Sequence, residues 1–257
     1  MNLILLSHSD LAADPKNAHI TGHHLKHILE ILKPKLNDTL TVGLENGLIG
    51  EGRIVKQGPD KIELEVSLKD QPPAKIPAVL CLALMRPPVF RRVLQTAAAM
   101  GVGELHFFHS RRVEKSFWQS TALRDQAVRE ELVLGLEQAK DTVFPEVHFH
   151  KRFKPFVEDV LPALLKDRTG IVADPSGELF LRGTETRDGD ENVQRLRPPS
   201  PSTVSRPVHY LVIIGPEGGF IPFELEKFRE AGCRIVSLGE RILRVETAVV
   251  ALLAKLF

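Results

Sequence analysis

The feature that most constrains the fold is a pattern that occurs twice in residues 210–257: an apolar run of strand length, a short loop, and a helix-like segment. The first run reads LVII and leads into GPEGG at residues 215–219, and the second reads RIVSL and leads into GERILRVET at residues 239–247. Between them, residues 223–231 carry Leu225 and Phe228 among charged residues, as a surface helix does. Strands that alternate with helices predict a parallel α/β sheet, with both loops at the edge where such sheets bind ligands.

The same alternation starts at residue 78. Apolar runs predict strands at residues 78–84, 104–108 and 170–175, and helical spacing predicts helices at residues 89–100, 121–141 and 156–165. The almost wholly apolar residues 248–257 predict a last helix that is buried on most sides. Residues 78–257 are therefore expected to form an α/β domain whose parallel sheet is covered on both faces.

Residues 1–72 predict a smaller β domain with one helix. Apolar residues at helical spacing mark the helix over residues 21–32, which Pro34 ends. Strands at residues 39–44 and 48–55 are joined through Asn46 and Gly47, a strong hairpin signal, and residues 61–69 alternate between polar and apolar. We expect a compact β-barrel and place the domain boundary in residues 70–77, where three prolines interrupt regular structure.

Residues 182–207 consist mainly of charged residues, serine and proline, with almost nothing to bury. Burial in such a segment does not offset the entropy cost of ordering it, so we expect it to be mobile. It is an insertion rather than a linker, because a strand of the same domain resumes at Tyr210.

The composition is that of a soluble globular protein, with 257 residues of which 43% are hydrophobic and 26% charged. The apolar residues 3–6 lack a preceding basic region and are too few for a signal peptide, so they indicate a first strand. No apolar run approaches the length of a membrane span. Cys81 and Cys233 have no metal-type neighbours, and two reduced, buried thiols favour a cytoplasmic protein.

The net charge of +1 does not indicate a strongly basic nucleic-acid binder, but basic residues gather locally. Six of them lie between residues 86 and 115 against two acidic ones. Such a cluster suits phosphate contacts and equally suits a solvated face on two helices. If this cluster binds nucleic acid, such as RNA, the binding residues are Arg86, Arg91, Arg92, Arg111, Arg112, Lys115 and, as a stacking platform for a base, Trp118, although a single tryptophan more often belongs to the core.

Together, the two loops resemble the carboxyl-terminal motifs of the RsmE family of SPOUT methyltransferases, in which a strand ends in GPEGG and a later strand leads into LGxRxLRxET. The resemblance implies methylation of N3 of a uridine in small-subunit (16S) ribosomal RNA with S-adenosylmethionine. It also implies a trefoil-knotted carboxyl-terminal domain that holds the cofactor in the knot, an amino-terminal PUA-like domain that helps to bind RNA, and a homodimer. Hydrophobic periodicity would not predict a knot, because chains generally avoid them.

The expected cofactor site follows from the same resemblance. Glycines let the backbone approach a ligand closely, whereas a glycine-rich turn by itself is more often only a tight connection. In the resemblance the pocket is built from the two loops, largely through backbone, with the end of the strand near Ala173 and Asp174 below. The expected cofactor-binding residues are Ile214, Gly215, Pro216, Glu217, Gly218, Gly219, Leu238, Gly239, Arg241, Ile242, Leu243 and Ala173.

Transfer to uridine N3 requires loss of the N3 proton and stabilisation of the charge that spreads to the ring oxygens. Arg244, placed between apolar neighbours, is the first candidate for stabilising this charge. Glu246 and Glu217 are candidates for the proton acceptor if partial burial raises their pKa. Glu246 also suits the amino end of the last helix, and we favour that role.

No metal is required for this chemistry, and none is expected. His19, His23 and His27 are spaced four residues apart, but Thr21 and Gly22 interrupt a helix after His19. No cysteine or third acidic ligand accompanies them.

Several positions depart from the family pattern, and all lie outside the two loops. The chain has Glu30, Thr96, Ala99 and Asp141 where the family usually carries charged residues, most of them potential RNA contacts. A methyltransferase acting on a different RNA position is therefore one alternative. Another is a catalytically silent RNA-binding or ribosome assembly protein that keeps the fold. A third alternative is a protein that binds nucleotide phosphates through its glycine-rich turns. It has little support, because the motifs GxxxxGK[ST] and GxGxxG are both absent.

Overall fold

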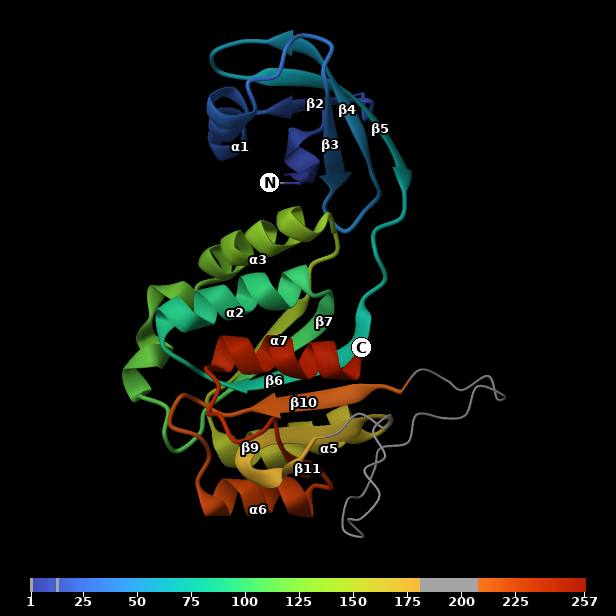
Figure 1. The fold of residues 1–257 in the computed structure, drawn as a ribbon. Helices are drawn as coiled ribbons and strands as arrows, with labels where there is room; N and C mark the ends of the chain where they lie inside the picture. Colours follow the sequence, from blue (N-terminus) through green and yellow to red (C-terminus); the bar gives the residue numbers. More distant parts are fainter. Residues whose placement is uncertain (1, 13, 181–207) are drawn as a thin grey trace, which may run out of the picture.

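The structure is a computed structural model that describes residues 2–12, 14–180 and 208–257, except for the side chains of His23 and His27. The predicted insertion at residues 182–207 lies outside the described residues. The molecule contains two sheets, which lie one above the other in Figure 1. The smaller sheet comes from the amino-terminal part of the chain and the larger one from the rest.

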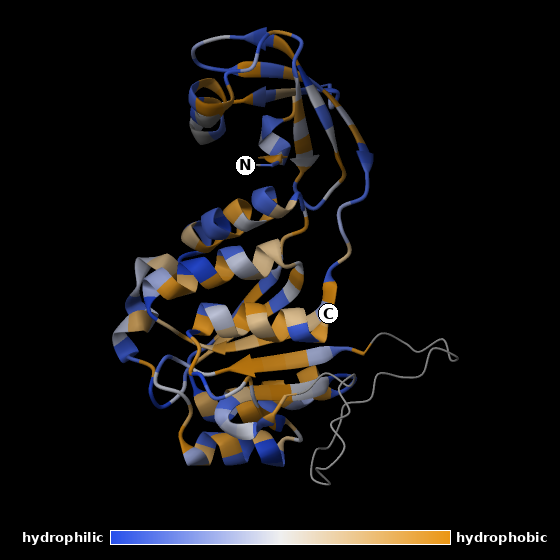
Figure 2. Ribbon diagram, in the orientation of Figure 1, coloured by the Kyte–Doolittle hydropathy of each residue, from blue (hydrophilic) through white to orange (hydrophobic). Residues whose placement is uncertain are grey.

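The larger sheet has six strands in the order β11-β9-β10-β6-β7-β8, and every neighbouring pair is parallel. Its central strands are apolar and buried, and they appear orange in Figure 2. The predicted parallel sheet is thereby confirmed. The strands are β6 (Ile76–Ala83), β7 (Val102–Phe108), β8 (Glu146–His150), β9 (Thr169–Leu179), β10 (Tyr210–Ile214) and β11 (Arg234–Ser237).

Helices cover both faces of this sheet (Figure 1). One face carries α2 (Pro87–Ala99), α3 (Asp125–Ala139) and α7 (Val245–Leu256), with α3 packed on the outer side of α2. The other carries α6 (Pro222–Glu230) and a helical stretch made of α4 (Phe153–Pro155), η5 (Phe156–Val160) and α5 (Leu161–Leu165). Aromatic rings fill both interfaces: Phe90 meets Phe107 under α2, and Phe108 stacks on Phe156 beneath η5.

The predicted helices and strands of this part exist, with shifted ends. Residues 121–141 divide into the short η4 (Thr121–Leu123) and α3, preceded by η3 (Lys115–Gln119). Strand β9 continues beyond the predicted residue 175 to Leu179. Helix α7 starts at Val245, and its exposed residues, Thr247, Val250 and Ala254, lie along one narrow stripe. The other residues of the helix are buried or partly buried, which agrees with the expectation that it is buried on most sides.

The smaller sheet has five strands in the order β1-β3-β4-β5-β2. The predicted hairpin is confirmed, with Asn46 in the left-handed region at φ +53°. Because the strand order ends at β1 and β2, the sheet is a half-barrel and not the compact β-barrel that we expected. Its strands are β1 (Ile4–Leu6), β2 (Asn17–Ile20), β3 (Thr39–Leu44), β4 (Ile49–Gln57) and β5 (Ile62–Asp70), accompanied by η1 (His8–Asp10), α1 (Gly22–His27) and its continuation η2 (Ile28–Leu32).

Strand β1 joins the two halves of the molecule. Side chains alternate between the faces of a strand, and here Leu5 packs into the core of the larger sheet while Ile4 and Leu6 pack into the core of the smaller one. The buried Glu137 of α3 accepts a hydrogen bond from the backbone nitrogen of Leu5 at 3.0 Å. Among the described residues, no helix is both long and apolar enough to cross a membrane.

Candidate active site

A cavity of about 560 Å³ lies at the carboxyl ends of β10 and β11 and beside the middle of β9, where the two loops meet. The structure brings all twelve expected cofactor-binding residues together around it. The three expected catalytic residues, Glu217, Arg244 and Glu246, line it as well. The further lining residues are Arg86, Val89, Arg92, Asp174, Pro175, Ser237, Val245 and Ala248.

The GPEGG loop is held in a tight turn. Gly219 has φ +72°, a conformation that side-chain-bearing residues rarely adopt, and its backbone nitrogen donates to the carbonyl oxygen of Pro216 at 2.8 Å. From outside the loop, Arg112 donates through Nη1 to the carbonyl oxygen of Gly218. The loop thereby presents its backbone to the cavity in a fixed shape.

The second loop forms another part of the cavity wall. The hydroxyl of Ser237 donates to the carbonyl oxygen of Gly239 at 3.1 Å and accepts from its backbone nitrogen at 3.2 Å. Strand β9 forms the floor through a register shift against β11 between Ile235 and Val236, which leaves residues 173–177 unpaired with β11. Asp174 and Pro175 of this bulge face the cavity.

Arg244 is the residue that precedes α7, and it is exposed at the rim of the cavity. Of the two apolar neighbours, Val245 is buried and Leu243 is 36% exposed. Arg244 itself is exposed, so its charge stays in water. A guanidinium at the rim can meet a base that enters from solvent.

Glu246 lies in the first turn of α7 and forms an ion pair with Arg92 at 3.0 Å. Its hydrogen bond to the backbone at the helix start, and then Arg92, lower the pKa of this carboxyl below its ordinary value. A lowered pKa is the opposite of what a general base here needs. The structure therefore supports the helix-start role of Glu246 and contradicts its role as a base with a raised pKa.

The basic residues expected to bind RNA divide into two groups. Arg86 and Arg92 line the cavity and pair with its two glutamates, Arg86 with Glu217 at 3.2 Å. Arg91 pairs with Glu131 of α3 at 3.6 Å, which agrees with the alternative of a solvated helix face. The exposed residues Arg111, Arg112 and Lys115 follow β7 on the loop that leads to η3.

Trp118 is only partly open to solvent. Its Nε1 donates to Nδ1 of His109 at 2.9 Å, and its ring meets Phe149 edge to face. These contacts favour the core role that we gave as the alternative to a stacking platform.

Sequence reasoning missed Glu224, which is buried and 2% exposed. Its carboxylate accepts from the backbone nitrogens of Arg111 at 2.7 Å and Ile221 at 3.0 Å, so it ties the start of α6 to the basic loop. The signal was visible, because a proline at the first helical position with a glutamate two residues later marks a helix start.

Among the departures from the family pattern, Asp141 is now explained. It is buried and accepts from Nζ of Lys75 at 2.7 Å and from the backbone nitrogen of Val143 at 3.0 Å. Its buried carboxylate therefore ties the segment after α3 to Lys75. Glu30 is exposed, and Thr96 and Ala99 are partly buried on α2.

Comparison with known proteins agrees with this geometry. The family model described as RNA methyltransferase domain matches residues 72–256. Ribosomal RNA small subunit methyltransferase E of Treponema pallidum is 25% identical over 253 residues, covering 98% of this chain and 88% of the relative. The enzyme of that name from Mesomycoplasma hyopneumoniae is 27% identical over 198 residues, 76% of each chain.

Among solved structures, the Neisseria gonorrhoeae methyltransferase E bound to S-adenosyl methionine has the same fold, with a TM-score of 0.71, 20% identity, and coverage of 99% of this chain and 95% of that one. Three findings agree with an RNA methyltransferase: the fold, the cavity between the two loops, and the match over residues 72–256. The chain belongs to the RNA methyltransferase family, and the resemblance to RsmE that its two loops predicted is confirmed.

Proposed function

We propose that this protein binds S-adenosylmethionine between its two loops and methylates N3 of a uridine in small-subunit ribosomal RNA. The observation that carries the proposal is the single cavity that both loops line, with Arg86, Arg92 and Arg244 among the lining residues. Relatives named as small subunit methyltransferases support the substrate class. The S-adenosyl methionine bound to the Neisseria gonorrhoeae enzyme supports the cofactor.

The cavity and the residues around it fit this cofactor. The cavity volume of about 560 Å³ is in the range of small-molecule sites, about 300–1,000 Å³. Val89, Leu238 and Val245 offer apolar contact to an adenine, and the carboxylate of Asp174 suits a positively charged sulfonium. When bound, S-adenosylmethionine supplies a methyl carbon that the sulfonium activates for displacement.

The remaining chemistry falls to the protein. The guanidinium of Arg244 stabilises the negative charge that develops on the ring oxygens of the base. The carboxylate of Glu217, which lines the cavity and pairs with Arg86, accepts the N3 proton. A base must leave its stack to reach this cavity, so the rim position of Arg244 suits its capture.

Calorimetric titration with S-adenosylmethionine and S-adenosylhomocysteine tests the cofactor site. We expect saturable binding of both near one site per chain. Absence of binding at millimolar ligand would contradict the proposal and favour the silent RNA-binding protein.

Arg244→Lys tests the catalytic role. A lysine keeps the charge but loses the planar donor pair, so S-adenosylmethionine affinity should persist while turnover on ribosomal RNA falls by about 10²- to 10³-fold. Arg152→Lys, a change at an exposed arginine that does not line the cavity, should leave both unchanged. Equal loss of affinity and turnover in Arg244→Lys would make this residue a cofactor ligand instead.

We further infer a finer architecture from the RsmE resemblance. Residues 1–72 form a PUA-like module that reads RNA together with Arg111, Arg112 and Lys115, and residues 78–257 form a SPOUT domain knotted at the cofactor site. Two chains form a homodimer through the exposed apolar side chains near α7, which include Ile242, Val250 and Phe257. Light scattering should give twice the chain mass, and Val250→Asp should shift the measured mass toward that of the monomer.

A ribosomal RNA substrate agrees with the cytoplasmic location that we expected.

A further inference from the structure

Three histidines and two glutamates lie on neighbouring strands at the edge of the larger sheet. The register pairs Glu104 with Glu146 and His106 with His148, and it pairs Phe108 with His150. Because alternate residues of a strand share a face, all five polar side chains project from the same side of the β7–β8 pair. This side faces η5, since Phe156 lies 5.0 Å from the ring of His150.

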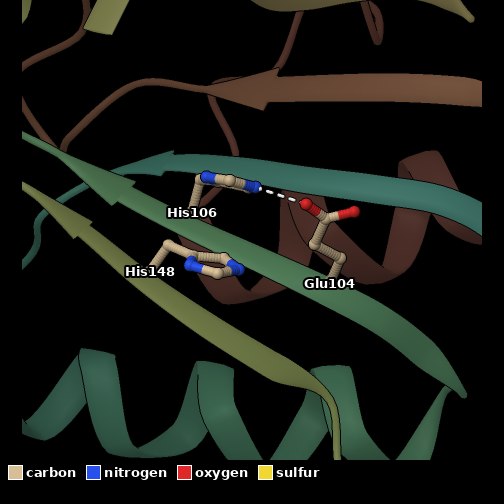
Figure 3. A group of neighbouring side chains, drawn as sticks. All are labelled: Glu104, His106 and His148. Atoms are coloured by element: carbon tan, nitrogen blue, oxygen red, sulfur yellow. Dashed lines mark hydrogen bonds and ion pairs between the residues drawn. The ribbon is translucent and has the colours of Figure 1, made fainter. Parts of the chain in front are cut away.

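Three of these side chains converge. Figure 3 shows Glu104 and His106 joined by a hydrogen bond, with His148 beside them on the adjacent strand. One ligand atom from each of the three lies within 4.8 Å of the others. The ring of His148 stacks on that of His106 with centroids 4.7 Å apart.

We propose that Glu104, His106 and His148 bind one Zn²⁺ ion, which clamps the edge strand β8 to β7. Two imidazoles and one carboxylate are a ligand set that zinc sites in proteins use. Ligand atoms on a tetrahedral zinc lie about 3.4 Å apart, whereas those here lie within 4.8 Å, so His148 needs to move by about 1.4 Å. Its side chain, 42% exposed on the edge strand, has room for that movement.

The surroundings orient the ligands as metal sites require. His106 points Nε2 at Glu104, at 2.8 Å, and Nδ1 at Nε2 of His150, at 2.9 Å. Without metal, the neutral rings are satisfied when His150 donates to His106 and His106 donates to Glu104. With metal on Nε2, the order reverses: His106 donates from Nδ1 to His150, which fixes its tautomer. The exchange moves protons between ring nitrogens and changes no net charge.

Two neighbouring charged groups lie beside the proposed ligands, Arg168 beside Glu104 and Glu146 beside His148. Arg168 lies 4.0 Å from the second oxygen of Glu104, which leaves Oε1 free to face the histidines. Glu146, 76% exposed, lies 3.4 Å from Nε2 of His148 and brings a further negative charge to the solvent side. Burial lowers the pKa of His106, and that of His150 to about 4, so both rings are neutral near pH 7.

A cavity separate from the cofactor cavity borders one of the three ligands. It has a volume of about 580 Å³ and is lined by Glu104, Glu146 and Arg168, together with Ile76 at the amino end of β6. The cofactor cavity lies at the opposite, carboxyl ends of the strands. Metal binding and cofactor binding are therefore separable in experiment.

The test is titration of the metal-stripped full-length protein with Co²⁺, followed by its visible absorption, with Zn²⁺ as competitor. We expect one equivalent of Co²⁺ to bind with a tetrahedral spectrum, Zn²⁺ to displace it, and Zn²⁺ to raise the melting temperature. His148→Ala should remove the spectrum, and His150→Ala should weaken binding by about 10- to 100-fold. His8→Ala, at an exposed histidine of the smaller sheet, should bind as the unchanged protein does.

His148 is partly exposed, so its variant should keep the circular dichroism of the unchanged protein, and Glu104→Gln gives an independent second variant. Binding that persists in both His148→Ala and Glu104→Gln would overturn the proposal, as would the absence of a cobalt spectrum at millimolar Co²⁺.

Discussion

Gly219 shows how one residue shapes the cofactor cavity. A methyl group added at Gly219 would meet only Nη1 of Arg112, at 3.8 Å, so space is available for it. The obstacle is the backbone, because φ +72° costs a residue with Cβ about 1–2 kcal/mol.

We therefore predict that Gly219→Ala lowers the free energy of unfolding by about 1 kcal/mol and weakens S-adenosylmethionine binding, because relief of the strain moves the loop. Thermal denaturation with and without the cofactor measures both effects. Gly58→Ala is the matched control, since the added carbon meets its nearest neighbour at an ordinary 3.4 Å. Unchanged S-adenosylmethionine binding in Gly219→Ala would show that the loop can adopt another turn conformation without loss of binding, and it would contradict this prediction.

Glu224 is a buried charged residue whose loss should destabilise the fold. It is buried, and its carboxylate accepts from two backbone nitrogens that join α6 to the loop after β7. Glu224→Ala should lower the free energy of unfolding by about 1–3 kcal/mol, because it leaves buried donors unsatisfied. Urea denaturation of this variant beside Glu226→Ala, at an exposed position of the same helix, separates burial from loss of charge. Similar values for the two variants would contradict this account.

The contact between α2 and α3 depends on the absence of a side chain. A carbon added at Gly135 of α3 would lie 2.3 Å from the carbonyl oxygen of Gln95 and 2.8 Å from Cβ of Ala98. The two helix backbones therefore approach more closely than any other residue at this position allows.

For this reason, the effect of Gly135→Ala on stability should be opposite in sign to the effect of the same substitution at a typical helical glycine. Helix propensity alone favours alanine by about 1 kcal/mol, whereas overpacking against α2 costs about 1–3 kcal/mol. We expect a net loss of stability in chemical denaturation and a lower melting temperature. A more stable variant would mean that α3 shifts on α2 without cost.

Strands β2 and β8 were not predicted, although both exist. They are only four and five residues long and carry polar side chains, Asn17 and His19 in one and Glu146, His148 and His150 in the other. Each is defined by its partner, β5 for β2 and β7 for β8. The same omission concealed the proposed zinc ligands, because Glu104 and His106 meet His148 only after the strands pair.

At the scale of the whole molecule, His24 of α1 connects the smaller sheet to the larger part. Its Nε2 lies 3.0 Å from the buried carboxylate of Glu137 on α3. This hydrogen bond, more than the opposing effect of burial, raises the pKa of His24 above its ordinary 6.5. A raised pKa in the folded state means that the charged pair stabilises the fold fully below pH 6.5, and that this contribution disappears as pH rises through the folded-state pKa.

We predict that His24→Asn destabilises the protein by about 1 kcal/mol at pH 6 and by less at pH 9. Urea denaturation at both pH values measures the difference between the variant and the unchanged protein, in which the titration of other groups cancels. His8→Asn serves as the control at an exposed histidine. A difference that stays constant or grows with pH would contradict the assignment.

The sequence by itself determined the class of fold and the identity of the two loops. Apolar runs alternating with helical patterns indicate a parallel sheet, since both signals are local and arise from neighbouring residues. All twelve expected cofactor residues line one cavity for the same reason: each loop is continuous in sequence, and parallel strands bring their carboxyl ends to one edge.

Only the tertiary structure decided which charges meet. Arg92 pairs with Glu246, Arg86 with Glu217, and Lys75 with Asp141, and the two members of each pair lie 66 or more residues apart in the sequence. Tertiary structure also placed Arg244 in solvent. Such outcomes depend on strand register and helix packing between distant segments, and no local pattern of apolar and polar residues encodes them.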